Sequence, residues 1–132
     1  MTVFIDTSAL YALLDRSDAN HRSAVNAWVD FLKSDERLIT SNYVLVESFA
    51  LTQGRLGIAA VRLLEEDIMP IINVNFVGRE IHRSSISAVL SAGRRNLSLV
   101  DCVSFEIMRT LGIKTAFTFD PHFKEQGFTI LP

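Results

Sequence analysis

The chain has 132 residues, of which 48% are hydrophobic and 21% are charged. This length suits a single domain with a sizeable core, so we expect one domain over residues 1–132. The composition excludes a disordered chain. The formal net charge of −2 gives no support to a general nucleic-acid coat, although a local basic strip is compatible with it.

The sequence also restricts the compartment. No apolar run approaches the length needed to span a membrane, and Asp6 stands where a signal peptide needs an apolar core. The single cysteine, Cys102, has no partner for an internal disulfide and is predicted to be a buried apolar side chain rather than a catalytic thiol. We therefore expect a cytoplasmic protein with no membrane association.

Short strands alternate with helices along the chain. The first strand is expected at 2–6, followed by a helix at 8–15 that Thr7 or Ser8 caps. The remaining expected elements, in order, are a helix at 20–33, a strand at 37–40, a helix at 43–53 ended by Gly54, a helix at 57–67, a strand at 70–74, a helix at 76–93, a helix at 99–111 ended by Gly112, a strand at 114–119, a turn at 121–125 and a strand at 129–131. This alternation predicts an α/β fold with a mostly parallel sheet covered on both faces.

Acidic residues occur near the expected carboxyl ends of the strands, which is where parallel sheets bind their ligands. Asp6 and Asp120 each follow an apolar strand, and Asp101 lies in the first turn of a helix. Glu47 lies within an apolar helix, where a carboxylate is unfavourable unless it is paired or bound to a metal. Because the carboxyl ends of parallel strands lie at one edge of the sheet, we expect these four acids to converge there.

Clustered carboxylates repel one another and take up protons unless a cation is present. Mg²⁺ and Mn²⁺ favour oxygen ligands, and such ions activate a water and stabilise the leaving oxygen when a phosphodiester is cleaved. The acids therefore predict a metal-dependent phosphodiesterase.

Four motifs in this order resemble the PIN domain family. They are Val-Phe-Ile-Asp6-Thr-Ser-Ala-Leu, Asn-Tyr-Val-Leu-Val-Glu47-Ser, Leu-Val-Asp101-Cys-Val-Ser and Phe-Thr-Phe-Asp120-Pro-His-Phe. Within the family, the chain looks most like the single-domain ribonuclease toxins of VapBC-type toxin–antitoxin systems. The resemblance implies a three-layer α/β/α sandwich, with about five strands here, and a Mg²⁺- or Mn²⁺-dependent endoribonuclease. It also implies an RNA substrate, a cognate antitoxin and a homodimer.

The resemblance assigns metal binding and catalysis to Asp6, Glu47 and Asp101, with Asp120 as a fourth and more variable acid. Each acid also has an ordinary structural alternative: a helix cap for Asp6, an exposed position for Glu47, compensation of the helix dipole for Asp101 and a turn for Asp120. Thr7 and Ser8 are candidates to contact the metal's water or a phosphate. Ser104 falls one helical turn after Asp101 and faces the same way, where many relatives have a polar or acidic residue that assists the site, so it is a third candidate.

Basic and imidazole side chains leave alternatives open. Four arginines either bind RNA phosphates or form a solvated surface: Arg79, Arg83, Arg94 and Arg95. The three histidines, His21, His82 and His122, have no metal-ligand spacing with one another. His122 lies two residues after Asp120, where it either contacts the substrate or, as we expect, is a surface residue of a turn.

Two other functions compete with a nuclease. One is a PIN-like module that binds RNA or protein without cleaving it, which the complete set of four acids disfavours. The other is a phosphotransfer enzyme with an aspartyl nucleophile at a strand end. In one such class an aspartate follows two residues after the nucleophile, but Ser8 stands at that position after Asp6.

Overall fold

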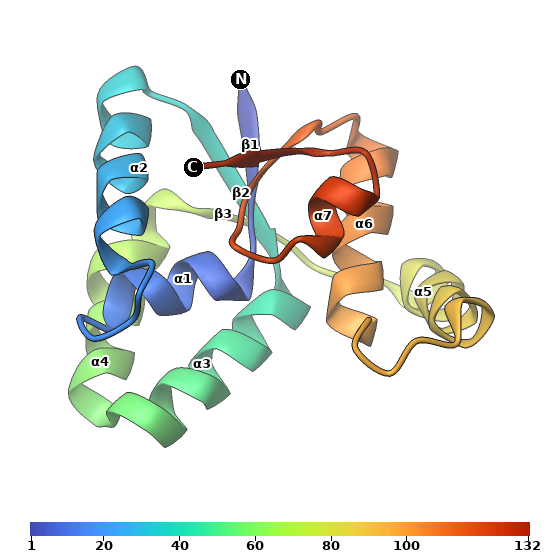
Figure 1. The fold of residues 1–132 in the computed structure, drawn as a ribbon, viewed down its shortest axis with the longest axis horizontal. Coiled ribbons are helices and arrows are strands. Elements are labelled where there is room, and N and C mark those ends of the chain that lie inside the picture. The colour runs from blue at the N-terminus through green and yellow to red at the C-terminus, as the bar shows by residue number, and fades with distance from the viewer.

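Five parallel strands form one sheet in the computed structural model, which describes residues 1–132 (Figure 1). The strands are β1 (Thr2–Ile5), β2 (Arg37–Ser41), β3 (Asn73–Asn75), β4 (Thr115–Phe117) and β5 (Thr129–Leu131), in the spatial order β3-β2-β1-β4-β5. Every neighbouring pair is parallel. The predicted fold class is confirmed.

Helices cover both faces of this sheet (Figure 1). The connections from β1 to β3 contain α1 (Thr7–Leu14), α2 (His21–Ser34), α3 (Asn42–Leu56) and α4 (Ile58–Leu63), and the later ones contain α5 (Arg79–Ala92), α6 (Leu99–Leu111) and α7 (His122–Glu125). Because crossovers between parallel strands are right-handed, the two groups of helices lie on opposite faces. None of the helices is both long enough and apolar enough to cross a membrane.

The strand order reverses direction between β1 and β4. From β1 the chain adds strands outward to β2 and β3, and then returns to the other side of β1 to add β4 and β5. Such a reversal opens a crevice beyond the carboxyl ends of the two strands, which is where open α/β sheets bind their ligands. Asp6 follows β1 directly, and Asp120 comes three residues after the end of β4.

The core explains why β1 is so well defined. Its residues Val3, Phe4 and Ile5 have no exposed surface, and the adjacent Phe117 of β4 packs edge-on against Phe31 of α2. A central strand covered on both faces must be apolar throughout, as this one is. Cys102 is also buried, as predicted, and burial raises the pKa of its thiol.

Several predicted boundaries are wrong. Gly54 lies inside α3, which ends instead at Leu56 and is capped by Gly57, a residue with a φ of 91° that suits glycine. After α4 the chain continues as one π turn (Leu64–Ile68) and one 3₁₀ turn (Met69–Ile71), so β3 begins later than expected. The 3₁₀ turn contains Pro70, which the sequence interpretation had placed in the strand.

Candidate active site

Asp6 is fixed by hydrogen bonds at the end of β1. Its backbone N–H donates to the Phe117 carbonyl at 3.1 Å, which extends the pairing of β1 with β4. One carboxylate oxygen accepts hydrogen bonds from the Ser8 hydroxyl at 2.8 Å, the Ser8 backbone N–H at 3.4 Å and the Thr118 hydroxyl at 2.9 Å. Asp6 itself is therefore the N-cap of α1, and the prediction that Thr7 or Ser8 caps this helix is wrong.

The environment of Asp6 disfavours its charge. Its residue is only 4% exposed, and burial raises the pKa of its carboxyl to about 6. The hydroxyls of Ser8 and Thr118 oppose this shift, whereas the negative charges of Asp101 and Asp120 add to it. A carboxyl group held in this way is stabilised as a carboxylate when a cation is close.

Asp101 enters the site from the first turn of α6. Its carboxylate accepts a hydrogen bond from the Ser98 backbone N–H at 3.0 Å, and the Ser98 hydroxyl accepts one from the Asp101 N–H at 3.1 Å. This capping box fixes both the start of the helix and the direction of the acid. Burial raises the pKa of the Asp101 carboxyl, and the charge of Asp120 adds to the effect. Asp101 thus has its ordinary structural role and also lies among the other acids.

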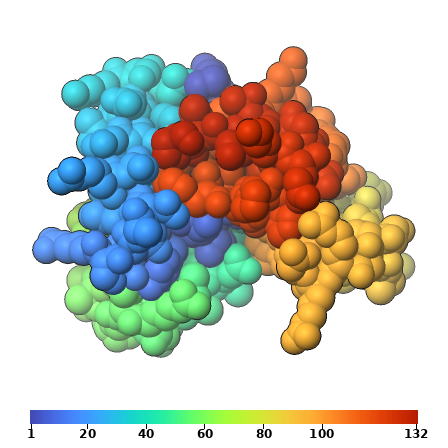
Figure 2. Space-filling view, viewed as in Figure 1, coloured from blue at the N-terminus to red at the C-terminus, as the bar shows by residue number.

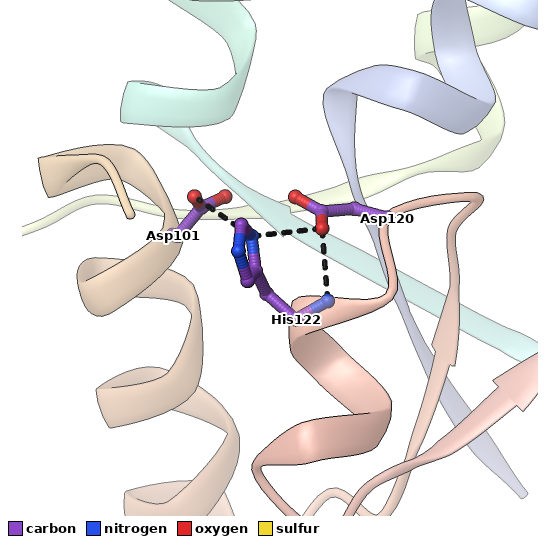
Figure 3. Close-up of side chains that lie close together, drawn as sticks. All are labelled: Asp101, Asp120 and His122. Atoms are coloured by element: carbon purple, nitrogen blue, oxygen red, sulfur yellow. Dashed lines mark hydrogen bonds and ion pairs between the residues drawn. The ribbon is translucent and has the colours of Figure 1, made fainter. Parts of the chain in front are cut away.

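Asp120 and His122 face Asp101 from the loop after β4 and from α7 (Figure 3). The Asp120 Oδ1 accepts a hydrogen bond from the His122 backbone N–H at 2.9 Å. The imidazole Nδ1 lies 2.9 Å from this oxygen and 4.0 Å from Asp101 Oδ2. One donor atom from each of the three residues lies within 4.8 Å of the other two. These residues form a compact set of potential metal ligands.

The prediction that His122 is a surface residue is wrong. The residue is buried, because the next residue, Phe123, is fully buried and packs edge-on against Phe105 of α6 at 4.9 Å. Anchoring this phenylalanine holds α7 against α6 and places the imidazole between the two carboxylates. The sequence did contain a signal that this turn is attached to the core. The short segment that holds His122 also contains two phenylalanines, Phe123 and Phe128.

The other two histidines lie elsewhere and do not join the cluster. His21 Nδ1 is 2.7 Å from the Ala12 carbonyl oxygen, and His82 Nδ1 is 2.5 Å from the Tyr43 hydroxyl. Of the three histidines, only His122 lies among the acids, and its spacing in the sequence did not reveal this.

Glu47 is exposed, so the expectation of a carboxylate enclosed by apolar neighbours is wrong. The core-facing side of α3 is formed by Val44, Ser48 and Thr52, which recur every fourth residue. Glu47 instead lines a surface depression of about 310 Å³ together with Asn42, Tyr43, Val46 and Val100. The last of these residues precedes Asp101, so the depression adjoins the acid cluster. Figure 2 shows the molecular surface notched between the teal and green part that includes α3 and the amber part that includes α5.

The three candidate hydroxyl residues have different environments. Ser8 belongs to the network around Asp6, because its hydroxyl also accepts a hydrogen bond from the Phe119 N–H at 2.9 Å. Thr7 is directed toward α3 and donates to the Val44 carbonyl at 3.4 Å. Ser104 is fully buried and donates to the Val100 carbonyl at 2.8 Å.

Thr118 was not singled out from the sequence, although it has the most direct contact with Asp6 apart from Ser8. Its hydroxyl donates to Asp6 at 2.9 Å and accepts from the Asp120 N–H at 3.0 Å, so it joins the two strand-end acids. The feature of the sequence that could have identified Thr118 is its position as a hydroxyl residue directly after the last residue of β4.

The arginines lie on exposed surface. Arg94 Nη2 is 3.5 Å from Glu125 Oε2, and no acidic partner within 4.0 Å is found for Arg79, Arg83 or Arg95. Those three guanidinium groups are therefore accessible to a polyanion.

The donor set fits a divalent cation. Asp101, Asp120 and His122 offer ligand atoms within 4.8 Å of one another, and Asp6 stands outside this set but is linked to Asp120 through the Thr118 hydroxyl. Burial raises the pKa of Asp6 and of Asp101, and the charge of neighbouring acids adds to the effect, as expected for buried acids without a counter-charge. The buried His122 Nδ1 faces the same space without a hydrogen-bond partner. An ion bound by these atoms would relieve both features.

Comparisons with known proteins bear on the family and the fold of the chain. The model of the PIN domain family matches residues 3–128. The 23S rRNA-specific endonuclease VapC20 of Mycobacterium tuberculosis is 32% identical over 127 residues, which cover 96% of this chain and 95% of the relative. The crystal structure of VapC20, described as a sarcin-ricin loop cleaving toxin, superposes with a TM-score of 0.86 at 29% identity and covers 98% of this chain and 99% of that one. FitAcB from Neisseria gonorrhoeae shares the fold, with a TM-score of 0.70 at 17% identity, covering 100% of this chain and 97% of that one.

Proposed function

Because this chain belongs to the PIN domain family, we propose that it is a Mg²⁺- or Mn²⁺-dependent endoribonuclease that cleaves ribosomal RNA as the toxin of a toxin–antitoxin pair. Family and fold were both predicted from the four motifs and are confirmed. The prediction of an RNA-cleaving nuclease is also confirmed at the level of the family and its VapC20 relative. The observation that carries the proposal is the grouping of Asp101, Asp120 and His122 at the reversal of strand order, with Asp6 linked to Asp120 through Thr118, in a chain that matches this endonuclease almost end to end.

In the proposed mechanism, the four acids hold the cation, with Asp6 and Asp101 as the best-fixed ligands. When bound, the metal supplies an activated water and stabilises the leaving oxygen of the phosphodiester. Ser8 and Thr118 keep the Asp6 carboxylate in one orientation, and the Ser98 capping box does the same for Asp101. This fixed placement limits the reorganisation that the reaction needs.

Substrate binding is assigned to the basic surface. Exposed Arg79 and Arg83 on α5 and Arg95 in the following loop are available to RNA phosphates, which would hold a strand beside the acids. The similarity to VapC20 favours 23S rRNA as the target. Ribosomal RNA lies in the cytoplasm, which is the compartment we propose.

A cognate antitoxin and a homodimer are part of the proposal, with residues 1–132 acting as one PIN-like domain. Large apolar side chains are highly exposed on both halves of the chain, among them Val46 at 70%, Phe76 at 76% and Leu90 at 76%. Exposed apolar surface of this kind is typical of sites that another protein covers.

The test is cleavage of 23S rRNA within purified ribosomes by the purified chain. We expect discrete fragments with Mn²⁺ or Mg²⁺, none with a chelator and none with Asp101→Asn. Intact rRNA under every metal condition, from a chain that is folded by circular dichroism, would favour the alternative of a non-catalytic RNA- or protein-binding module. Expression without an antitoxin should arrest growth, and the same substitution should abolish the arrest.

A further inference from the structure

One buried nitrogen at the acid cluster has no hydrogen-bond partner. The His122 residue is 9% exposed, and its Nδ1 is shielded from solvent and unpaired. Two other buried side-chain atoms are also unpaired, the hydroxyl oxygens of Thr52 and Ser85, but neither belongs to the cluster. The His122 nitrogen therefore differs from both, because it faces two carboxylates (Figure 3).

The distances around this nitrogen match those between ligands of one ion. Nδ1 lies 2.9 Å from Asp120 Oδ1, yet the contact lacks the alignment of a hydrogen bond. It lies 4.0 Å from Asp101 Oδ2. In an octahedral site with bonds of about 2.1 Å, adjacent ligand atoms are about 3 Å apart and opposite ones about 4 Å. The observed spacings are those of ligand atoms around a single small cation.

The other ring nitrogen is placed to hold the proton. Nε2 lies 3.9 Å from Glu125 Oε2, and this glutamate is itself paired with Arg94 at 3.5 Å. A proton on Nε2 is attracted to that carboxylate, which leaves the lone pair of Nδ1 on the side of Asp101 and Asp120. Metal-binding histidines are commonly oriented in this way, with the remote N–H directed at a carboxylate.

We propose that His122 binds the active-site metal through Nδ1, as a nitrogen ligand that completes the oxygen set of Asp101 and Asp120. This inference rests on the proposed function, because it concerns the metal of the same site. A ligand set with one imidazole favours Mn²⁺ over Mg²⁺, since imidazole binds first-row transition metals well whereas Mg²⁺ prefers oxygen. Glu125 is a positioning residue that orients the ring without touching the metal.

The test uses Mn²⁺ as both ligand and spectroscopic probe. Electron spin echo envelope modulation of Mn²⁺ bound to the wild-type chain should show coupling to a directly bound ¹⁴N nucleus. The coupling should vanish in His122→Asn and persist in the matched control His21→Gln. By calorimetry, His122→Asn should weaken Mn²⁺ binding roughly 10-fold and Mg²⁺ binding much less, and Glu125→Gln should have a smaller effect in the same direction.

The outcomes separate the two proposals. If Mn²⁺ binds the wild type and requires Asp101 but shows no ¹⁴N coupling, the His122 inference is overturned and the acid site remains. If the wild type binds no Mn²⁺, both are overturned. The wild-type spectrum decides the matter even if His122→Asn fails to fold, which circular dichroism would report.

Discussion

Asp6 and Glu47 were predicted as partners in one site, yet the fold treats the regions that carry them differently. At the end of β1, Asp6 is almost inaccessible and accepts three hydrogen bonds. On the outer side of α3, Glu47 is exposed beside an apolar depression. The sheet therefore holds the Asp6 carboxylate in place before any ligand binds, whereas no hydrogen bond or ion pair of the chain orients the Glu47 carboxylate.

The largest expected effect is the loss of catalysis in Asp6→Asn and Asp101→Asn. Each change removes a fixed negative charge from the candidate site while keeping the shape of the side chain. We expect the rate of Mn²⁺-dependent RNA cleavage to fall by about 1,000-fold or more, because metal-based charge stabilisation supplies several kcal/mol. The measurement is single-turnover cleavage at saturating enzyme. A wild-type rate in either variant would refute the assignment.

The next effect concerns stability without metal. The pKa of Asp6 is raised from 3.8 to about 6 in the folded chain, so between these values the folded state binds more protons than the unfolded state. The free energy of unfolding should therefore fall as pH rises from about 4 to about 6, by on the order of 3 kcal/mol from this group. Urea denaturation in chelator across this range measures the fall.

The matched variant for that experiment is Asp6→Asn, which cannot ionise at this position. Its stability should vary less over the same pH range, and above pH 6 it should exceed that of the wild-type apo protein. Identical pH profiles for the two chains would show that burial of Asp6 has no energetic consequence.

Glu47→Gln should have a smaller effect than either aspartate change. Since Glu47 is exposed, it loses less solvation as an anion and contributes a weaker, screened attraction to the cation. We expect a loss of roughly 10-fold in cleavage at limiting Mn²⁺, largely recovered at high Mn²⁺. A loss as large as that of Asp6→Asn, without recovery at high Mn²⁺, would show that Glu47 contributes as much to cleavage as the buried acids.

The smallest expected effect is on RNA binding. The double variant Arg79→Ala with Arg83→Ala should weaken RNA binding uniformly and reduce the salt dependence of log K by about 2. The control is Arg62→Ala on α4, an exposed arginine that pairs with Glu66 and lies among the helices of the first half of the chain. An equal change in slope for the control would mean that these arginines form a solvated face only.

The sequence was most informative where the path of the backbone alone determines the position of a side chain. The apolar run before Asp6 indicated a buried central strand. Parallel strands bring their carboxyl ends to one edge of the sheet regardless of the conformation of the connecting loops, so the position of Asp6 could be predicted. The rotation of α3 was not predictable in this way, because apolar residues occur on more than one side of it, as Val44, which is buried, and Val46, which is exposed, illustrate. The burial of His122 depends on the packing of Phe123 on Phe105 of another helix, so the aromatic residues of the turn indicate attachment to the core but not the direction of the imidazole.

The most direct test of a metal site at the strand reversal is a Mn²⁺ titration of the apo protein followed by thermal unfolding. We predict a saturable rise in Tm for the wild type at pH 7.5, and no rise for Asp6→Asn or Asp101→Asn, although Asp6→Asn begins from a higher Tm. Equal rises in all three chains, or no rise in any of them, would contradict the site.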